Sequence, residues 1–181
     1  MNTYISILRG INVSGHRVIK MDALKKLYAD LNLKNIRTYI QSGNVVFEEK
    51  DSNPKLIAKL ISQKIMKDFG FEVPVIVLDL PDLTTILENN PFVNERAEDV
   101  KFLHVTLLSD YPDPSDIDKI KAGPYGADEF IVSGRTLYLF CPAGYGNTKL
   151  SNTFFESKLK VSATTRNWKT MNELWRIAAG N

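Results

Sequence analysis

The sequence predicts an α+β fold in which a βαββαβ unit with an antiparallel sheet occurs twice, followed by a C-terminal helix. The same order of strand-like and helix-like segments appears in both halves of the 181-residue chain. Each half also contains two strand-like runs joined at a Ser-Gly dipeptide, which is typical of a hairpin turn. The 44% of hydrophobic residues is ordinary for a globular protein, and a chain of this length can bury a substantial core.

Six segments define the first unit. Helices are predicted where apolar residues recur at spacings of three and four, and strands where short β-rich runs end at turn residues. In chain order these are a strand at 3–9, a helix from 21, strands at 36–41 and 44–49, a helix from 54 to 69 and a strand at 73–79. Ser42-Gly43 predicts a tight hairpin, and Pro74 favours an edge position for the last strand.

The second unit repeats this order. Its predicted segments are a strand at 101–109, a helix at 114–121, strands at 127–132 and 135–141, a helix at 148–158, a strand at 160–164 and a last helix at 170–179. The repeat aligns Tyr39–Asn44 with Phe130–Arg135, and Phe47 with Tyr138. Each unit has the split βαβ, or ferredoxin-like, arrangement, with helices on one face of its sheet.

The domain organisation follows from this repeat. We expect a first unit at 1–80, a connecting helix and loop at 81–100, and a second unit with the C-terminal helix at 101–181. The whole chain is expected to form one compact structural domain.

Composition excludes several classes of protein. A formal net charge of +2 disfavours nucleic acid as a partner, so any anion site must be local. Cys141 is the only cysteine, which excludes an intramolecular disulfide and a Cys-rich zinc site. The sequence shows neither a signal peptide nor an apolar run of ~18 residues, so we expect a cytoplasmic protein without a membrane span.

Most enzyme templates are missing. The two histidines, His16 and His104, have no metal-binding spacing, and no nucleophile-elbow sequence occurs. By period two, His104 faces the same way as Thr106, which favours a partly buried and hydrogen-bonded side chain; the alternative is a catalytic role. His16 is expected to be exposed. No metal and no cofactor are predicted.

The first loop offers a candidate anion site. Arg9 ends the first strand, where it could grip a carboxylate or phosphate bidentately, and Asn12 and Lys20 follow. The alternative is a solvated arginine in a long, mobile loop. Gln41 and Asn44 flank the hairpin turn. We expect that turn at the opposite end of the sheet from the Arg9 loop, so that one unit alone cannot bring Arg9 and Asn44 together.

The second half offers two more candidates. Gly144–Lys149 could hold an anion on backbone amides and the Lys149 ammonium, although the Walker spacing is absent; the alternative is a Gly-rich turn that caps a helix. The segment Thr164–Trp168 is partly explained because Thr170 and Glu173 fit a capping box. Arg166, Asn167 and Trp168 are left unexplained by capping. Trp168 is expected to anchor a core or an interface, and the alternative is a platform on which a ligand stacks.

Several segments carry a resemblance that runs nearly end to end. They are Leu8-Arg9-Gly10-Ile11-Asn12-Val13 with Lys20-Met21, Thr38 to Phe47, Asn90-Pro91-Phe92, Lys149-Leu150, and Thr164-Thr165-Arg166-Asn167-Trp168. They resemble the signatures of a largely bacterial family, the domain of unknown function 1697 family. Gly146–Leu150 departs mildly from the family pattern but keeps the lysine and a hydroxyl. The resemblance implies a duplicated ferredoxin-like fold and supplies no activity.

Three functions therefore compete. The first is a binding protein whose cationic cleft takes a small anionic ligand or nucleotide; its residues would be Arg9, Asn12, Lys20, Gln41, Asn44, Lys149, Arg166 and Asn167. The second is a metal-independent enzyme for a phosphorylated or carboxylated metabolite, with Ser42 or Thr165 as nucleophile and no base nominated. The third is single-stranded nucleic-acid binding on hairpin aromatics such as Phe47, Tyr138 and Phe140. Ligand identity, oligomeric state and pathway are not predicted.

Overall fold

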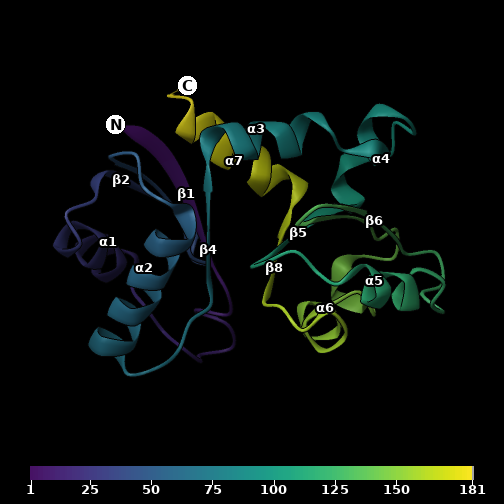
Figure 1. Ribbon diagram of the computed structural model, residues 1–181, viewed down its shortest axis with the longest axis horizontal. Helices are drawn as coiled ribbons and strands as arrows, with labels where there is room; N and C mark the ends of the chain where they lie inside the picture. The colour runs from purple at the N-terminus through teal and green to yellow at the C-terminus, as the bar shows by residue number, and fades with distance from the viewer. Residues whose placement is uncertain (181) are drawn as a thin grey trace. The chain divides into compact units, whose positions relative to one another are not determined.

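In the computed structural model, which describes residues 1–180, the chain divides into two compact units (Figure 1). Unit 1 contains Met1–Thr84 and the C-terminal segment from Glu173, and unit 2 contains Thr85–Asn172. Each unit has one four-stranded antiparallel sheet, and the predicted α+β fold with two ferredoxin-like units is confirmed. That the whole chain folds as one domain stays a prediction.

Unit 1 follows the predicted order of elements. They are β1 (Asn2–Leu8), α1 (Met21–Asp30), β2 (Lys34–Tyr39), β3 (Asn44–Glu49), α2 (Pro54–Phe69) and β4 (Val75–Asp79), followed by α3 (Leu80–Glu88). The sheet order is β2-β3-β1-β4, which places β4 at an edge as Pro74 predicts. Local chemistry determines the ends of α2: the Asn53 side chain accepts a hydrogen bond from the Lys55 amide, and Gly70 ends the helix at a φ of 79°.

The position of the β2–β3 turn corrects the sequence prediction. Both β1 and β2 run antiparallel to β3, so they run in the same direction. Their C-terminal residues therefore lie at the same end of the sheet. Ile7 pairs with Asn44, and the Leu8 amide donates to the Gly43 carbonyl at 2.8 Å. The turn therefore lies beside the Arg9 loop. It is also longer than predicted, because Tyr39 pairs with Asn44 and four residues lie between them.

Unit 2 repeats this topology with the sheet order β6-β7-β5-β8. Its elements are α4 (Pro91–Asn94), the 3-10 turn η1 (Val100–Phe102), β5 (Leu103–Leu108), α5 (Pro114–Lys121), β6 (Glu129–Ser133), β7 (Thr136–Phe140), the 3-10 turn η2 (Tyr145–Asn147), α6 (Asn152–Leu159) and β8 (Ala163–Asn167), followed by α7 (Trp168–Ala178). α6 starts later than predicted because the Ser151 hydroxyl accepts a hydrogen bond from the Phe154 amide and caps it there.

The residue alignment between the repeats needs a shift of one position. The β6–β7 turn has two residues where the β2–β3 turn has four, so Phe47 corresponds to Leu139. Tyr138 corresponds to Val46, on the other face of the strand, because side chains alternate along a strand. Phe47 packs among α1 and α2, whereas the Tyr138 hydroxyl donates to the Ile86 carbonyl at 2.9 Å.

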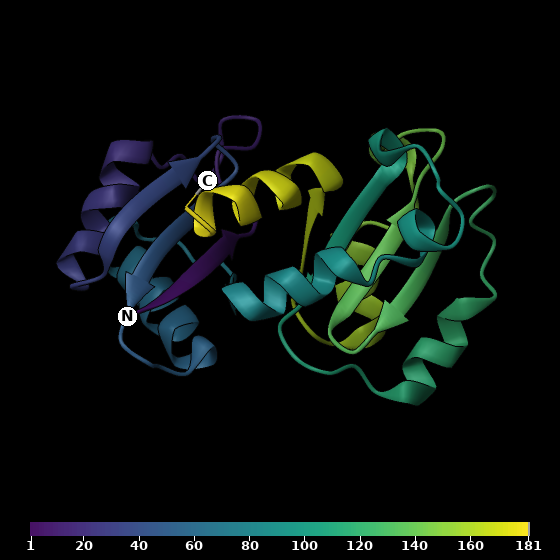
Figure 2. The same cartoon turned by 90° about the horizontal axis from the view of Figure 1, so that it is seen from above.

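Each sheet carries its main hydrophobic core on the face covered by two helices, α1 and α2 in unit 1 and α5 and α6 in unit 2. The second face is covered as well. In unit 2, Phe92 of α4 lies 5.8 Å from the Phe140 ring. In unit 1, Arg37 of β2 donates to the Ile177 carbonyl at 2.6 Å, which joins the last turn of α7 to this sheet (Figure 2).

Candidate functional site

Four of the predicted site residues meet at one end of the unit 1 sheet. Arg9 follows β1, Asn12 lies in the next loop, and Gln41 and Asn44 belong to the β2–β3 turn and the strand it opens. The Leu8–Gly43 hydrogen bond joins the two segments. The sequence separates Arg9 and Asn44 by 35 positions, and the direction of the strands brings their segments together.

Asn12 holds this loop in place. Its Nδ2 donates to the carbonyls of Ile19 at 2.9 Å and Gln41 at 2.8 Å, and its Oδ1 accepts from the Ile19 amide at 2.8 Å. The side chain thus ties both ends of the loop to the β2–β3 turn, with its own backbone in the left-handed region at a φ of 55°. The Asn12 side chain therefore holds the loop through hydrogen bonds to main-chain groups of Ile19 and Gln41.

Of the other predicted site residues in this region, Asn44 is buried and hydrogen-bonded within the turn, whereas Gln41 and Lys20 are exposed. The buried Asn44 Nδ2 donates to the Tyr39 carbonyl and to the Ser42 hydroxyl, each at 3.0 Å. The exposed Gln41 supplies its carbonyl to Asn12. Lys20 is exposed and precedes α1 without a capping hydrogen bond from its side chain.

Arg9 lines a groove that the sequence does not reveal. The groove encloses about 520 Å³ and is lined by Arg9, Arg17, Ser62, Gln63, Met66, Glu72, Val73 and Pro74. The Arg9 amide donates to the Pro74 carbonyl at 2.9 Å, which holds the end of β1 against the entry to β4. The groove therefore combines two guanidinium groups with one carboxylate, that of Glu72.

Arg17 is the cation that sequence reasoning missed. Its backbone lies in the left-handed region at a φ of 47°, and the nearest non-neighbouring atom to a Cβ built on Gly10 is Arg17 Nη1, at 3.5 Å. The loop thus folds back so that Arg17 returns to the neighbourhood of Arg9. Only its place beside His16, in a Gly-rich loop after a strand, could have drawn attention to it.

The predicted residues of unit 2 lie near the start of β5, the first strand of its sheet in chain order, whereas Arg9 follows the end of β1 in unit 1. Asn167 pairs with His104 near the start of β5, and the loop that holds Lys149 follows the end of β7, which pairs with Leu103. The Lys149 ammonium donates to the Pro124 carbonyl at 3.2 Å. The Arg166 guanidinium donates to the Thr165 carbonyl at 2.9 Å, and burial lowers the pKa of Arg166 to about 10.

Asn167 caps α7. Its Oδ1 accepts a hydrogen bond from the Thr170 amide at 2.8 Å. The predicted capping box of Thr170 and Glu173 is wrong, because the helix begins at Trp168 and both residues lie inside it. Trp168 itself is 8% exposed, in keeping with its predicted role as an anchor.

His104 is partly buried as predicted, but its hydrogen bonding is incomplete. Its ring stacks on Tyr145 with centroids 4.7 Å apart, and its Nδ1 is buried without a hydrogen-bond partner among the residues that the structure describes. Burial lowers the pKa of His104 below 6.5, because charging the ring would require a buried cation.

We expect this histidine to make stability pH-dependent below neutrality. As the pH falls through 6.5 the unfolded chain takes up a proton at position 104 before the folded protein does, so the free energy of unfolding decreases between 6.5 and the lower folded pKa. The loss is at most about 1.4 kcal/mol per pH unit. Urea unfolding at pH 7.5 and 5.5 should show a smaller difference for His104→Phe and His104→Gln than for the wild type; equal differences would contradict the assignment.

The two hydroxyls considered as nucleophiles are occupied by structural hydrogen bonds. The Thr165 hydroxyl lies 2.6 Å from that of Thr106 and donates to the Asn152 Oδ1 at 2.7 Å. Ser42 accepts from Asn44. The amide oxygen of Asn152 is too weak a base to activate the Thr165 alcohol, so the hydrogen bonds of Thr165 organise the fold.

The Cys141 thiol and the possible metal ligands give no further candidate site among the described residues. Burial raises the pKa of the Cys141 thiol to about 11, which keeps it protonated at neutral pH. Among residues 1–180 no three or more histidine, cysteine, aspartate or glutamate side chains gather where they could hold a metal ion. In the same range no helix is long and apolar enough to span a membrane.

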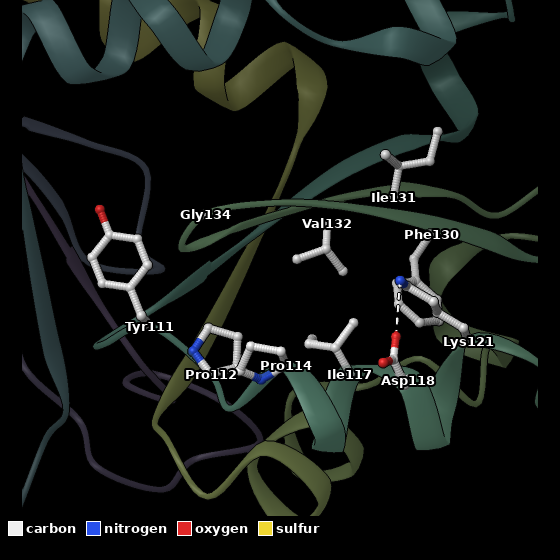
Figure 3. A pocket seen from close by; sticks show the side chains of 10 residues that line it. All are labelled: Tyr111, Pro112, Pro114, Ile117, Asp118, Lys121, Phe130, Ile131, Val132 and Gly134. Atoms are coloured by element: carbon white, nitrogen blue, oxygen red, sulfur yellow. Dashed lines mark hydrogen bonds and ion pairs between the residues drawn. The ribbon is translucent and has the colours of Figure 1, made fainter.

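Unit 2 has a groove of different character between β6 and α5. It encloses about 560 Å³ and is mostly apolar, with Val132 and Ile117 pointing toward one another across it and Ile131 pointing away (Figure 3). Its two charged residues neutralise each other, because Lys121 Nζ lies 3.0 Å from Asp118 Oδ1. This groove lacks the paired cations of the Arg9 groove.

Comparison with known proteins now adds to this geometry. A family model described as "Protein of unknown function (DUF1697)" matches residues 1–138. The chain belongs to this family. The DUF1697 match covers all of unit 1 up to Thr84, and with it Arg9, Arg17 and the β2–β3 turn. Lys149, Arg166 and Asn167 lie beyond residue 138, so their part in a family site stays a prediction.

A solved structure supports the fold. The chain is similar to a protein described as the conserved bacterial protein SP0830 from Streptococcus pneumoniae, with a TM-score of 0.65 and 23% identity over 98% of each chain. At this identity the likeness shows a shared fold. No curated protein matches the chain.

Proposed function

We propose that this DUF1697 protein binds a small anionic ligand, such as a phosphorylated or carboxylated metabolite or a nucleotide, in the Arg9 groove. The observation that carries the proposal is that Arg9 and Arg17 line the same groove of about 520 Å³. Guanidinium groups pair with carboxylates and phosphates through two parallel hydrogen bonds, which gives both affinity and orientation. Ligand pockets commonly have volumes of roughly 300–1,000 Å³.

The surrounding structure supports this role because it orders the loop that carries both arginines. Asn12 and the Leu8–Gly43 hydrogen bond hold the loop to the sheet. Another part of the lining is also fixed, because the Ser62 hydroxyl of α2 donates to the Val73 carbonyl at 2.8 Å. A loop ordered before binding loses less entropy when the ligand arrives. Glu72 would repel part of a highly charged ligand, which favours one with few negative charges or with a donor group beside them.

The binding test uses defined anions. Orthophosphate, succinate and adenosine monophosphate are titrated calorimetrically against the wild type, Arg9→Ala, Arg17→Ala and Lys59→Ala, the last being an exposed cation on α2 outside the groove. Each charge-assisted hydrogen bond is worth roughly 1.5–3 kcal/mol, so either arginine variant should bind the preferred anion about 10- to 100-fold more weakly. Lys59→Ala should bind it like the wild type.

Two further measurements distinguish the possible causes of weaker binding. Lys149→Ala and Arg166→Ala report whether the same ligand also depends on unit 2. Urea unfolding of every variant separates lost binding from lost folding. The proposal fails if none of the anions binds to the wild type, or if Lys59→Ala weakens binding as much as Arg9→Ala does.

A further inference from the structure

Unit 1 has a second cavity at the other end of its sheet. It encloses about 520 Å³ between the first half of α2, the end of α1 and the segment that follows β3. Glu49 marks this end, because it pairs with Asn2 at the start of β1, whereas Asn44 pairs with Ile7 at the Arg9 end. The volume lies within the range of small-molecule sites.

The wall of this cavity is apolar and partly open. Ile57 and Ile61 of α2 and Leu33 form a buried floor. Leu56 and Leu60, one helical turn apart on α2, line the same cavity and remain 61% and 55% exposed. Two large exposed leucines beside an apolar cavity provide surface that a ligand could remove from water.

Two polar groups of the cavity are carboxylates, which are hydrogen-bond acceptors with negative charge. Glu49 and Asp51 both line it, and among residues 1–180 neither has a lysine, arginine or histidine nitrogen within 4.0 Å. Their hydrogen bonds are to uncharged donors: Glu49 accepts from the Lys50 amide, and Asp51 accepts from Asn2 Nδ2 at 3.4 Å. No cationic side chain lines the cavity.

The remaining polar residues are neutral. The Ser52 amide donates to the Tyr4 hydroxyl at 3.1 Å, and the Asn53 side chain caps α2. The charged chemistry of the cavity is therefore that of two carboxylates beside an apolar wall. Charge complementarity requires a cationic partner, and the enclosed volume suits a small molecule.

We propose that this cavity binds a small amphipathic cation, whose apolar chain lies along Leu56 and Leu60 and whose ammonium group lies at the carboxylates of Glu49 and Asp51. An anion of the same shape is repelled by both carboxylates. A neutral analogue gains only the apolar contact. This site is separate from the Arg9 groove and does not depend on it.

Three ligands of equal chain length test the proposal. Octylammonium, octanol and octanoate, below their aggregation concentrations, are titrated at pH 7 and low salt while the methyl resonances of labelled leucines are recorded. Octylammonium should bind most tightly, about three- to tenfold better than octanol, because two partly exposed ion pairs add modest affinity. Octanoate should bind most weakly. The resonances of Leu56 and Leu60 should shift.

Matched variants identify the source of the preference. The double variant Glu49→Gln with Asp51→Asn should reduce octylammonium affinity to that of octanol and leave octanol unchanged. Glu48→Gln, the neighbouring carboxylate of β3 outside the cavity, is the control and should keep the preference. Leu60→Ala, an exposed change, should weaken all three ligands.

The outcomes are decisive and independent of the anion site. Equal affinity for octylammonium and octanol in the wild type, or a preference that survives the double variant, overturns the proposal. Failure of octylammonium to bind also overturns the proposal, and would favour a protein partner as the group that covers the exposed leucines. Arg9→Ala should leave octylammonium binding unchanged, so that failure of one site does not imply failure of the other.

Discussion

Replacing Gly43 by alanine is expected to lower the free energy of unfolding by about 2–4 kcal/mol. Gly43 has a φ of 85°, which L-residues adopt only at a cost. An added Cβ would also lie 2.7 Å from the Ile11 Cδ1 and 2.8 Å from the Leu8 Cβ. The second contact is with an atom next to the backbone of β1, which cannot move aside without shifting the strand. Urea unfolding measures the loss.

Gly15→Ala is the matched control. Gly15 has a similar φ of 76°, but no atom lies within 4 Å of its added Cβ, so only the backbone penalty of roughly 1 kcal/mol applies. Equal losses for the two variants would mean that the close approach of the turn to β1 contributes nothing. Gly43→Ala should also weaken any ligand of the Arg9 groove, because Leu8 directly precedes Arg9.

The largest loss is expected for Phe47→Ala, at about 3–5 kcal/mol. Phe47 is fully buried between β3 and the helices of unit 1, with ring centroids 5.9 Å from Tyr4 and 5.5 Å from Tyr28. Alanine would leave a cavity between two tyrosines. Their hydroxyls are held by Ser52 and Ser6, so the rings cannot collapse into the space without breaking hydrogen bonds.

Phe47→Leu tests the packing explanation. Leucine keeps most of the apolar volume and should cost well under half as much as alanine. Near-ultraviolet circular dichroism of the folded variants reports the packing of the two tyrosines. A loss below about 1 kcal/mol for Phe47→Ala would show that this part of the core can rearrange.

The sequence predicts the elements whose ends have local chemical signals. α2 and α5 start at Pro54 and Pro114, each after a residue whose side chain caps the helix. β8 is displaced from its predicted place by three residues. Its sequence Ala-Thr-Thr-Arg-Asn has no apolar alternation, and what makes it a strand is pairing with β5.

The candidate site is harder to predict because its decisive contacts involve the backbone. The carbonyls that Asn12 and Asn44 bind carry no sequence signature, so both asparagines could be read as ligand-binding residues. Arg17 reaches the Arg9 groove only because the loop turns back through several left-handed residues. The β2–β3 turn is predicted at the wrong end of the sheet for a different reason. The βαββαβ topology itself makes β1 and β2 run in the same direction, and this consequence could have been drawn from the sequence.

Asn12 also bears on how freely this region can change during evolution. All three hydrogen bonds of its side chain are made to main-chain groups, which every residue type other than proline supplies. The exposed position 41 can therefore change its side chain without loosening the loop, whereas Asn12 cannot be replaced. Related proteins could diversify the side chains around the Arg9 groove, and so their ligand preference, on an unchanged framework.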